Sequence, residues 1–132
     1  MIQNKFIPLK ESIILKELGY DELCVARFIK SQFSMNVLGN WYKHNSNEVS
    51  TKFLGAILWQ DVFDWFREKH NLPSMVYPVV YAKNRIEIEQ EDMVYSYQIY
   101  QKGKTRVFTD EEDTYEIARL KCLQKLIEII KE

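Results

Sequence analysis

The chain has 132 residues, of which 46% are hydrophobic and 14% aromatic, so it can bury a core of its own, and we expect one domain over 1–132. Eighteen Lys and Arg against nineteen Asp and Glu give a net charge of −1, which argues against a general binder of nucleic acid or anionic membranes. We expect no signal peptide, because Met1–Lys5 precede a short, charge-interrupted segment, and no apolar run reaches the ~20 residues that a membrane span needs. We therefore expect a cytoplasmic protein.

The first expected helix starts near Pro8 and runs to Leu18. A proline suits the first helical turn, and Gly19 supplies the left-handed residue that ends many helices. The apolar stripe of this helix is expected to be Ile14, Leu15 and Leu18.

Two segments after this helix have strand composition: 24–29 and, less clearly, 33–41. Residues 43–50 are polar and lack periodicity, which is typical of an exposed loop. The short apolar segment 53–58 fits two alternatives, a strand or the lead-in to the next helix.

The second expected helix covers 59–70 and ends before Pro73. Helical spacing places an apolar face on Trp59, Val62, Phe63, Phe66 and His70.

Strands are expected next. Residues 75–82 are rich in Val and Tyr, 85–89 alternate weakly, and 93–100 alternate clearly. Gly103 is the expected tip of a hairpin that returns through 105–108.

The last segment, 113–131, predicts an amphipathic helix with Asp113 as its N-cap and Glu116 completing a capping box. Its broad apolar side is Tyr115, Ala118, Leu120, Cys122, Leu123, Leu126, Ile127, Ile129 and Ile130. The complete order is α-β-β-α-β-β-β-α. This order predicts an α+β fold, an antiparallel sheet with helices packed on one face.

Residues that could carry catalysis are sparse. Both histidines lack a partner at ligand spacing, and the sequence contains no Cys-x-x-Cys, His-Glu-x-x-His, phosphate-loop or nucleophile motif. The acidic run 110–113 is explained by the positive N-terminus of the last helix. Cys24 and Cys122 are expected to be reduced and buried, with one disulfide as the alternative. We predict no enzymatic activity, no metal site and no cofactor.

Two kinds of binding remain. The leading prediction is a protein partner held by exposed aromatic residues, for which Trp41 and Trp65 are the candidates, with the rim of the core as the alternative place for Trp65. The alternative is nucleic acid held by a tyrosine-bearing sheet with flanking basic residues, namely Tyr95, Tyr97, Lys102, Lys104 and Arg106. Neither prediction fixes whether the chain is a monomer or a homodimer.

Two further residues have alternative roles. Arg119 interrupts the apolar arc of the last helix, where its stem can lie on apolar surface with its head in water, or the head can mark a binding site. His70 closes the aromatic helix on its apolar side, where a partly buried ring is the ordinary explanation and catalysis the alternative.

From Trp59 to Ile130, the helix-strand-strand-strand-helix order resembles that of double-stranded-RNA-binding domains. That family has a basic cluster where its last helix begins, whereas this chain has Asp113-Thr114-Tyr115-Glu116, so the resemblance implies topology without RNA binding. A second resemblance rests on residues 15–22, 63–70 and 114–123. It is to uncharacterised small proteins of Bacteroides-type bacteria and their prophages. This second resemblance implies a cytoplasmic accessory role in a mobile element and supplies no activity, cofactor or catalytic residue.

Overall fold

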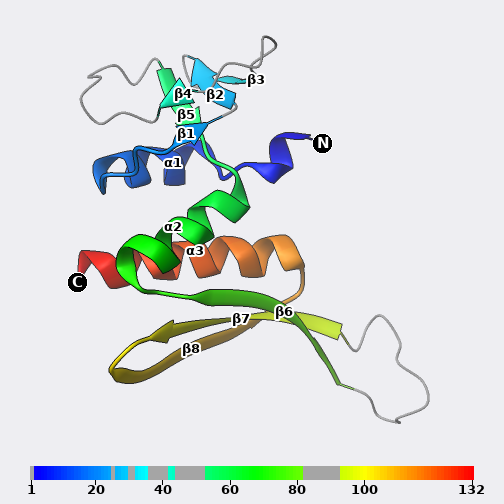
Figure 1. Ribbon diagram of the computed structural model, residues 1–132. Helices are drawn as coiled ribbons and strands as arrows, with labels where there is room; N and C mark the ends of the chain where they lie inside the picture. Colours follow the sequence, from blue (N-terminus) through cyan, green and yellow to red (C-terminus); the bar gives the residue numbers. More distant parts are fainter. Residues whose placement is uncertain (1, 25, 30–31, 36–41, 44–52, 82–92) are drawn as a thin grey trace. The chain divides into compact units, whose positions relative to one another are not determined.

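A computed structural model describes residues 2–24, 26–29, 32–35, 42–43, 53–81 and 93–132 (Figure 1). The chain divides into two compact units, 1–65 and 66–132, and the division falls inside a helix. Within the described part of the chain, none of the helices combines the length and the apolar composition that a membrane crossing requires.

The α+β class is confirmed, and the three α-helices occur where the sequence predicts them. In chain order the elements are η1 (Ile2–Lys5), α1 (Leu9–Glu17), β1 (Leu23–Cys24), β2 (Ala26–Ile29), β3 (Gln32–Met35), β4 (Tyr42–Lys43), β5 (Phe53–Ala56), α2 (Trp59–His70), β6 (Ser74–Val80), β7 (Met93–Gln101), β8 (Lys104–Glu112) and α3 (Tyr115–Lys131). All strand pairs are antiparallel, but the described strands form three sheets where the sequence analysis expects one: β1-β4, β3-β2-β5 and β6-β7-β8.

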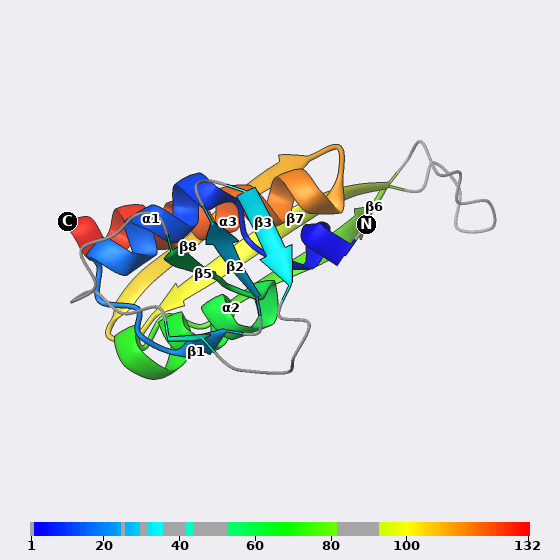
Figure 2. The same cartoon turned by 90° about the horizontal axis from the view of Figure 1, so that it is seen from above.

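The first unit is built around β2, which lies between β3 and β5 (Figure 2). Alternate residues of β2, Ala26 and Phe28, are buried against Phe6 and Ala56. The Phe33 ring packs on this cluster, with its centroid 5.0 Å from that of Phe6. The open alternative for 53–58 is therefore resolved: the segment holds strand β5 and then leads into α2. The expected loop 43–50 begins with a strand residue, because Lys43 pairs with Leu23, and its remainder lies outside the described residues.

The first helix ends as predicted at a left-handed glycine. Gly19 has φ +97°, its N–H donates to the carbonyl of Lys16, and the next N–H, of Tyr20, donates to the carbonyl of Leu15. The buried side of α1 differs from the predicted stripe, because Glu11, Ser12 and Leu15 are buried while Ile14 and Leu18 are only half-buried.

The buried side of α2 includes a residue that the spacing argument left out. Trp59, Val62 and Phe66 are buried as expected, and Phe63 and His70 are half-buried. Trp65 is also buried, and its ring meets that of Tyr20 edge-on at 5.4 Å. The helix ends at His70, followed by Asn71 with φ +55° and then by Pro73.

The second unit is a three-stranded meander with β7 at its centre and α3 along one face (Figure 1). Gly103 forms the tip between β7 and β8 with φ +81°, as predicted. Strand β8 runs four residues beyond the expected 105–108, and the expected strand at 85–89 lies outside the described residues.

The N-cap of α3 is one residue later than the sequence analysis places it. Thr114, not Asp113, has the extended cap conformation, and its hydroxyl accepts a 3.2 Å hydrogen bond from the N–H of Ile117. The predicted apolar side is largely confirmed, with Ala118, Cys122, Leu123, Leu126, Ile127 and Ile129 buried. Tyr115 is the exception, since it is exposed at the first turn.

Candidate binding face

The two faces of the β6-β7-β8 sheet carry different side chains because neighbouring residues of a strand point to opposite sides. The register pairs Val76 with Tyr97 and Tyr97 with Asp110, so these three positions share one face. The register also pairs Tyr77 with Ser96 and Ser96 with Glu111, which share the other. The first face is covered by α3.

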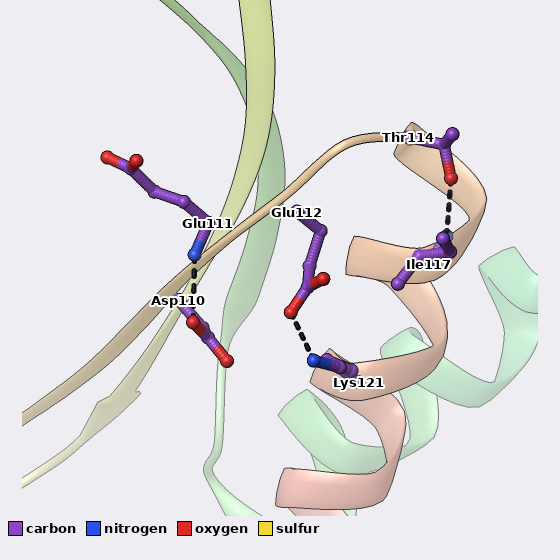
Figure 3. A network of polar contacts seen from close by, with 6 residues as sticks. All are labelled: Asp110, Glu111, Glu112, Thr114, Ile117 and Lys121. Carbon is purple, nitrogen blue, oxygen red and sulfur yellow. Dashed lines mark hydrogen bonds and ion pairs between the residues drawn. The ribbon is translucent and has the colours of Figure 1, made fainter.

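Several contacts fix α3 to its face of the sheet. Tyr97, at 6% exposure, and Ile99, fully buried, face the helix from β7. The Tyr95 ring meets that of Tyr115 edge-on at 6.0 Å. Glu112, at the end of β8, accepts a hydrogen bond from the ammonium of Lys121, shown with the Thr114 cap in Figure 3.

The opposite face, which we call the open face, is exposed at large apolar and aromatic side chains. Met75 is 49% exposed, Tyr81 54% and Tyr100 43%. Tyr77, Val79, Val94 and Gln98 are half-buried between them. Among the residues whose side chains the structure describes, the register places the following on the open face: Met75, Tyr77, Val79, Tyr81, Val94, Ser96, Gln98, Tyr100 and Glu111.

The polar tips of the open face are paired with one another. Tyr81 follows the last residue of β6, and its hydroxyl donates a hydrogen bond to the carboxylate of Glu111 on β8. This bond joins the two outer strands of the sheet. The Tyr100 hydroxyl donates to the side-chain oxygen of Gln98. The bond to Glu111 raises the pKa of Tyr81 above its ordinary value. Because both hydroxyl donors are already bonded, a partner can cover these two tyrosines without leaving their O–H groups unsatisfied.

Charge on the open face is low and lies at its ends. Among the described residues of this face, Glu111 is the charged one. Asp110 and Asp113 are exposed beside it, and Lys102 is exposed at the hairpin tip. The Asp110 carboxylate accepts a 3.0 Å hydrogen bond from the backbone N–H of Glu111 (Figure 3). The centre of the face is therefore neutral, rich in tyrosine and methionine.

The tyrosines proposed for nucleic acid are on the face that α3 covers. Tyr97 is buried and Tyr95 is half-buried against Tyr115, so neither offers a free ring for stacking on a base. Burial, followed by the nearby Asp110, raises the pKa of Tyr97. Lys102 is exposed as expected, and the side chains of Lys104 and Arg106 lie outside what the structure describes.

One of the two tryptophans proposed for protein contact is within the described residues, and it is buried. Trp65, at 6% exposure, belongs to the core with Tyr20, which corrects its reading as a contact residue and agrees with its alternative as a core residue. Trp41 lies outside the described residues.

Arg119 and His70 both have the surroundings of structural residues. The Arg119 guanidinium lies 5.4 Å from the centre of the Tyr115 ring, and burial lowers its pKa. The His70 ring packs 5.9 Å from that of Phe66, and burial lowers its pKa as well. Each side chain thus packs against an aromatic ring of its own helix.

The two cysteines are free and buried, as the sequence analysis expects. Burial raises the pKa of each thiol to about 12. The Cys24 thiol donates to the carbonyl of Glu22 at 3.6 Å. Over the described residues, no three His, Cys, Asp or Glu side chains are grouped so that they could hold a metal ion.

The sequence contains a pattern that could have predicted the open face, although the sequence analysis selected tryptophans and basic residues instead. Met75, Tyr77, Val79 and Tyr81 alternate along one strand with residues that face the other way, so both sides of that strand are apolar. A strand with two apolar sides needs cover on both, and α3 supplies only one. Comparison with protein-family models, curated proteins and solved structures finds no match to this chain.

Proposed function

We propose that this chain is a non-enzymatic binding protein whose open face docks a protein partner with an apolar, weakly charged surface. The observation that carries the proposal is the exposure of Met75, Tyr81 and Tyr100 on one side of a sheet whose other side is covered by α3 at Tyr97 and Ile99. Tyrosine and methionine are enriched at protein interfaces, where their large side chains bury area at low entropic cost.

The charge of the open face favours protein over nucleic acid. A nucleic-acid groove needs cations that follow the phosphates, and aromatic rings free to stack on bases. The described part of the open face has Glu111 as its charge, with Asp110 and Asp113 beside it, and these would repel phosphate. Among the side chains that the structure describes, Lys102 is the cation at the hairpin end of the face.

The wider role proposed is that of an accessory protein of a mobile element in the bacterial cytoplasm. Its support is the sequence resemblance to small prophage-associated proteins, carried by residues 15–22, 63–70 and 114–123. A small accessory protein of this kind would act by occupying a surface of another protein.

Site-specific photo-crosslinking in bacterial cells tests the docking proposal. A photoreactive residue replaces Met75 on the open face or, as the matched control, Ile117, which is 43% exposed on α3 of the same unit. We expect protein adducts from position 75 that resist nuclease and disappear when Tyr100→Glu is added. Nucleic-acid adducts, or equal yields at both positions, would refute the proposal.

A further inference from the structure

We infer that the partner on the open face is a second copy of this chain, packed face to face with its strands running in the opposite direction. This inference rests on the proposed function and names its partner. A symmetric dimer uses the same patch on both copies, so the patch must be compatible with itself in shape, hydrogen bonding and charge.

The first argument is the distribution of charge along the sheet. Lys102 is exposed at the hairpin tip, and Glu111 and Asp113 are exposed towards the other end. Glu111 pairs with Ser96, six residues from Lys102 along the chain, which is about 20 Å of strand. A copy turned end over end therefore brings each basic tip over the acidic end of its partner, and this contact occurs twice.

The second argument is the order of residues across the face. Met75 and Gln98 are paired and form a row near its middle. A two-fold axis along this row stacks β7 of one copy on β7 of the other, so Tyr100 of one copy lies over Ser96 of the other, with Tyr77 beside it on β6. Tyr100 is thus placed next to Tyr77 of the second copy on both sides of the axis, at the ~10 Å spacing of packed sheets.

The third argument is that the polar groups of the face do not oppose burial. The hydroxyls of Tyr81 and Tyr100 are bonded within their own sheet, to Glu111 and Gln98. The described side chains at the centre of the face bear no charge, so two copies meet there without repulsion between them. A dimer formed by hydrogen bonds between the edge strands of two copies is less suited to this sheet. The edge strand β6 contains Pro78, which lacks an N–H, and the edge strand β8 ends in the charged residues 110–112.

Sedimentation velocity of the full chain over a concentration series tests the inference, with charge reversal as the diagnostic. We expect a monomer–dimer equilibrium in the wild type. Lys102→Glu and Glu111→Lys should each weaken the dimer roughly tenfold, because each creates two repulsive contacts. When the two changes are combined, the dissociation constant of the dimer should return to within about threefold of the wild-type value, since opposite charges face each other again.

Two control variants separate charge from other effects. Lys131→Glu reverses an exposed charge on α3 and should leave the dimer unchanged. Tyr81→Phe removes the bond to Glu111 without changing charge, and should weaken the dimer less than Glu111→Lys does.

A wild type that stays monomeric throughout would overturn the inference, as would a double variant weaker than either single variant. If the chain is monomeric while position 75 still crosslinks to another protein, the proposed function stands and the second copy is rejected. If position 75 gives no protein adducts either, both fail.

Discussion

Replacing two neighbouring residues of β7 by alanine should show that the two faces of its sheet have different roles. Ile99 is fully buried on the face under α3, whereas Tyr100 is 43% exposed on the open face. Ile99→Ala removes three carbons, at about 0.8 kcal/mol each, and leaves a cavity, so we expect a loss of about 3–4 kcal/mol. Tyr100→Ala loses one exposed hydrogen bond and some strand packing, which together cost about 1 kcal/mol or less.

Amide hydrogen exchange of the α3 peptides, read by mass spectrometry, measures this difference within the second unit. Ile99→Ala should speed exchange of the most protected α3 amides by about 150- to 700-fold, while Tyr100→Ala should change it by about fivefold or less. Equal acceleration in the two variants, or a larger effect from Tyr100→Ala, would refute the assignment of the faces.

Three further predictions concern a helix cap, an acidic residue and the thiols. Thr114→Ala should lower the free energy of unfolding by about 1 kcal/mol in urea titrations followed by circular dichroism, because the threonine hydroxyl makes the capping bond. Asp113→Ala should lower it by clearly less. A larger loss from Asp113→Ala would show that Asp113 is the N-cap, as the sequence predicts. Burial first, and then the neighbouring carboxylates of Asp64 and Glu22, raise the pKa of Asp61, so the folded state holds this proton more tightly than the unfolded state does. The resulting stabilisation is complete below the ordinary aspartate pKa and is lost as the pH rises through the folded pKa, so the stability advantage of Asp61→Asn over the wild type should grow from pH 4 to pH 7; a constant difference would contradict this reasoning. Cys24 and Cys122 are buried, and burial raises the pKa of each thiol to about 12, so a thiol reagent at pH 8 should modify them only at the rate of unfolding. Rapid labelling of the native chain would contradict this prediction, because it would show that a thiol is accessible.

The helices were largely predictable because their signals are local. The apolar spacing of 113–131, the left-handed Gly19 and Pro73 each act within a few residues, and α1, α2 and α3 lie where these signals place them. The cap of α3 shows the limit of this reasoning. Asp113 and Thr114 are both good caps, and the choice depends on where β8 ends, which is decided by pairing with β7.

The strands of the first unit were harder to predict because pairing is not local. Tyr42–Lys43 is polar in sequence, yet it forms a strand because it pairs with Leu23–Cys24, some twenty residues earlier. Similarly, the burial of Trp65 depends on Tyr20, which precedes it by 45 positions. Periodicity within one helix does not contain this information.

The binding face was only half predictable. Alternation in 93–100 correctly grouped Tyr95, Tyr97 and Ile99, but a period of two does not state which side a helix will cover. The contact residues that the sequence analysis selects, Tyr95 and Tyr97, therefore lie on the side that α3 covers. The register and α3 together assign the sides.

The central claim is that one face of the β6-β7-β8 sheet is core and the other a binding surface, and hydroxyl-radical footprinting tests it most directly. In dilute solution, Met75, Tyr81 and Tyr100 should be oxidised rapidly and Tyr97 slowly, in line with their exposure. When the chain is concentrated or its crosslinked partner is added, protection should appear at Met75 and Tyr100, while the exposed Tyr115 on α3 stays reactive. Rapid oxidation of Tyr97, or protection confined to Tyr115, would contradict the account.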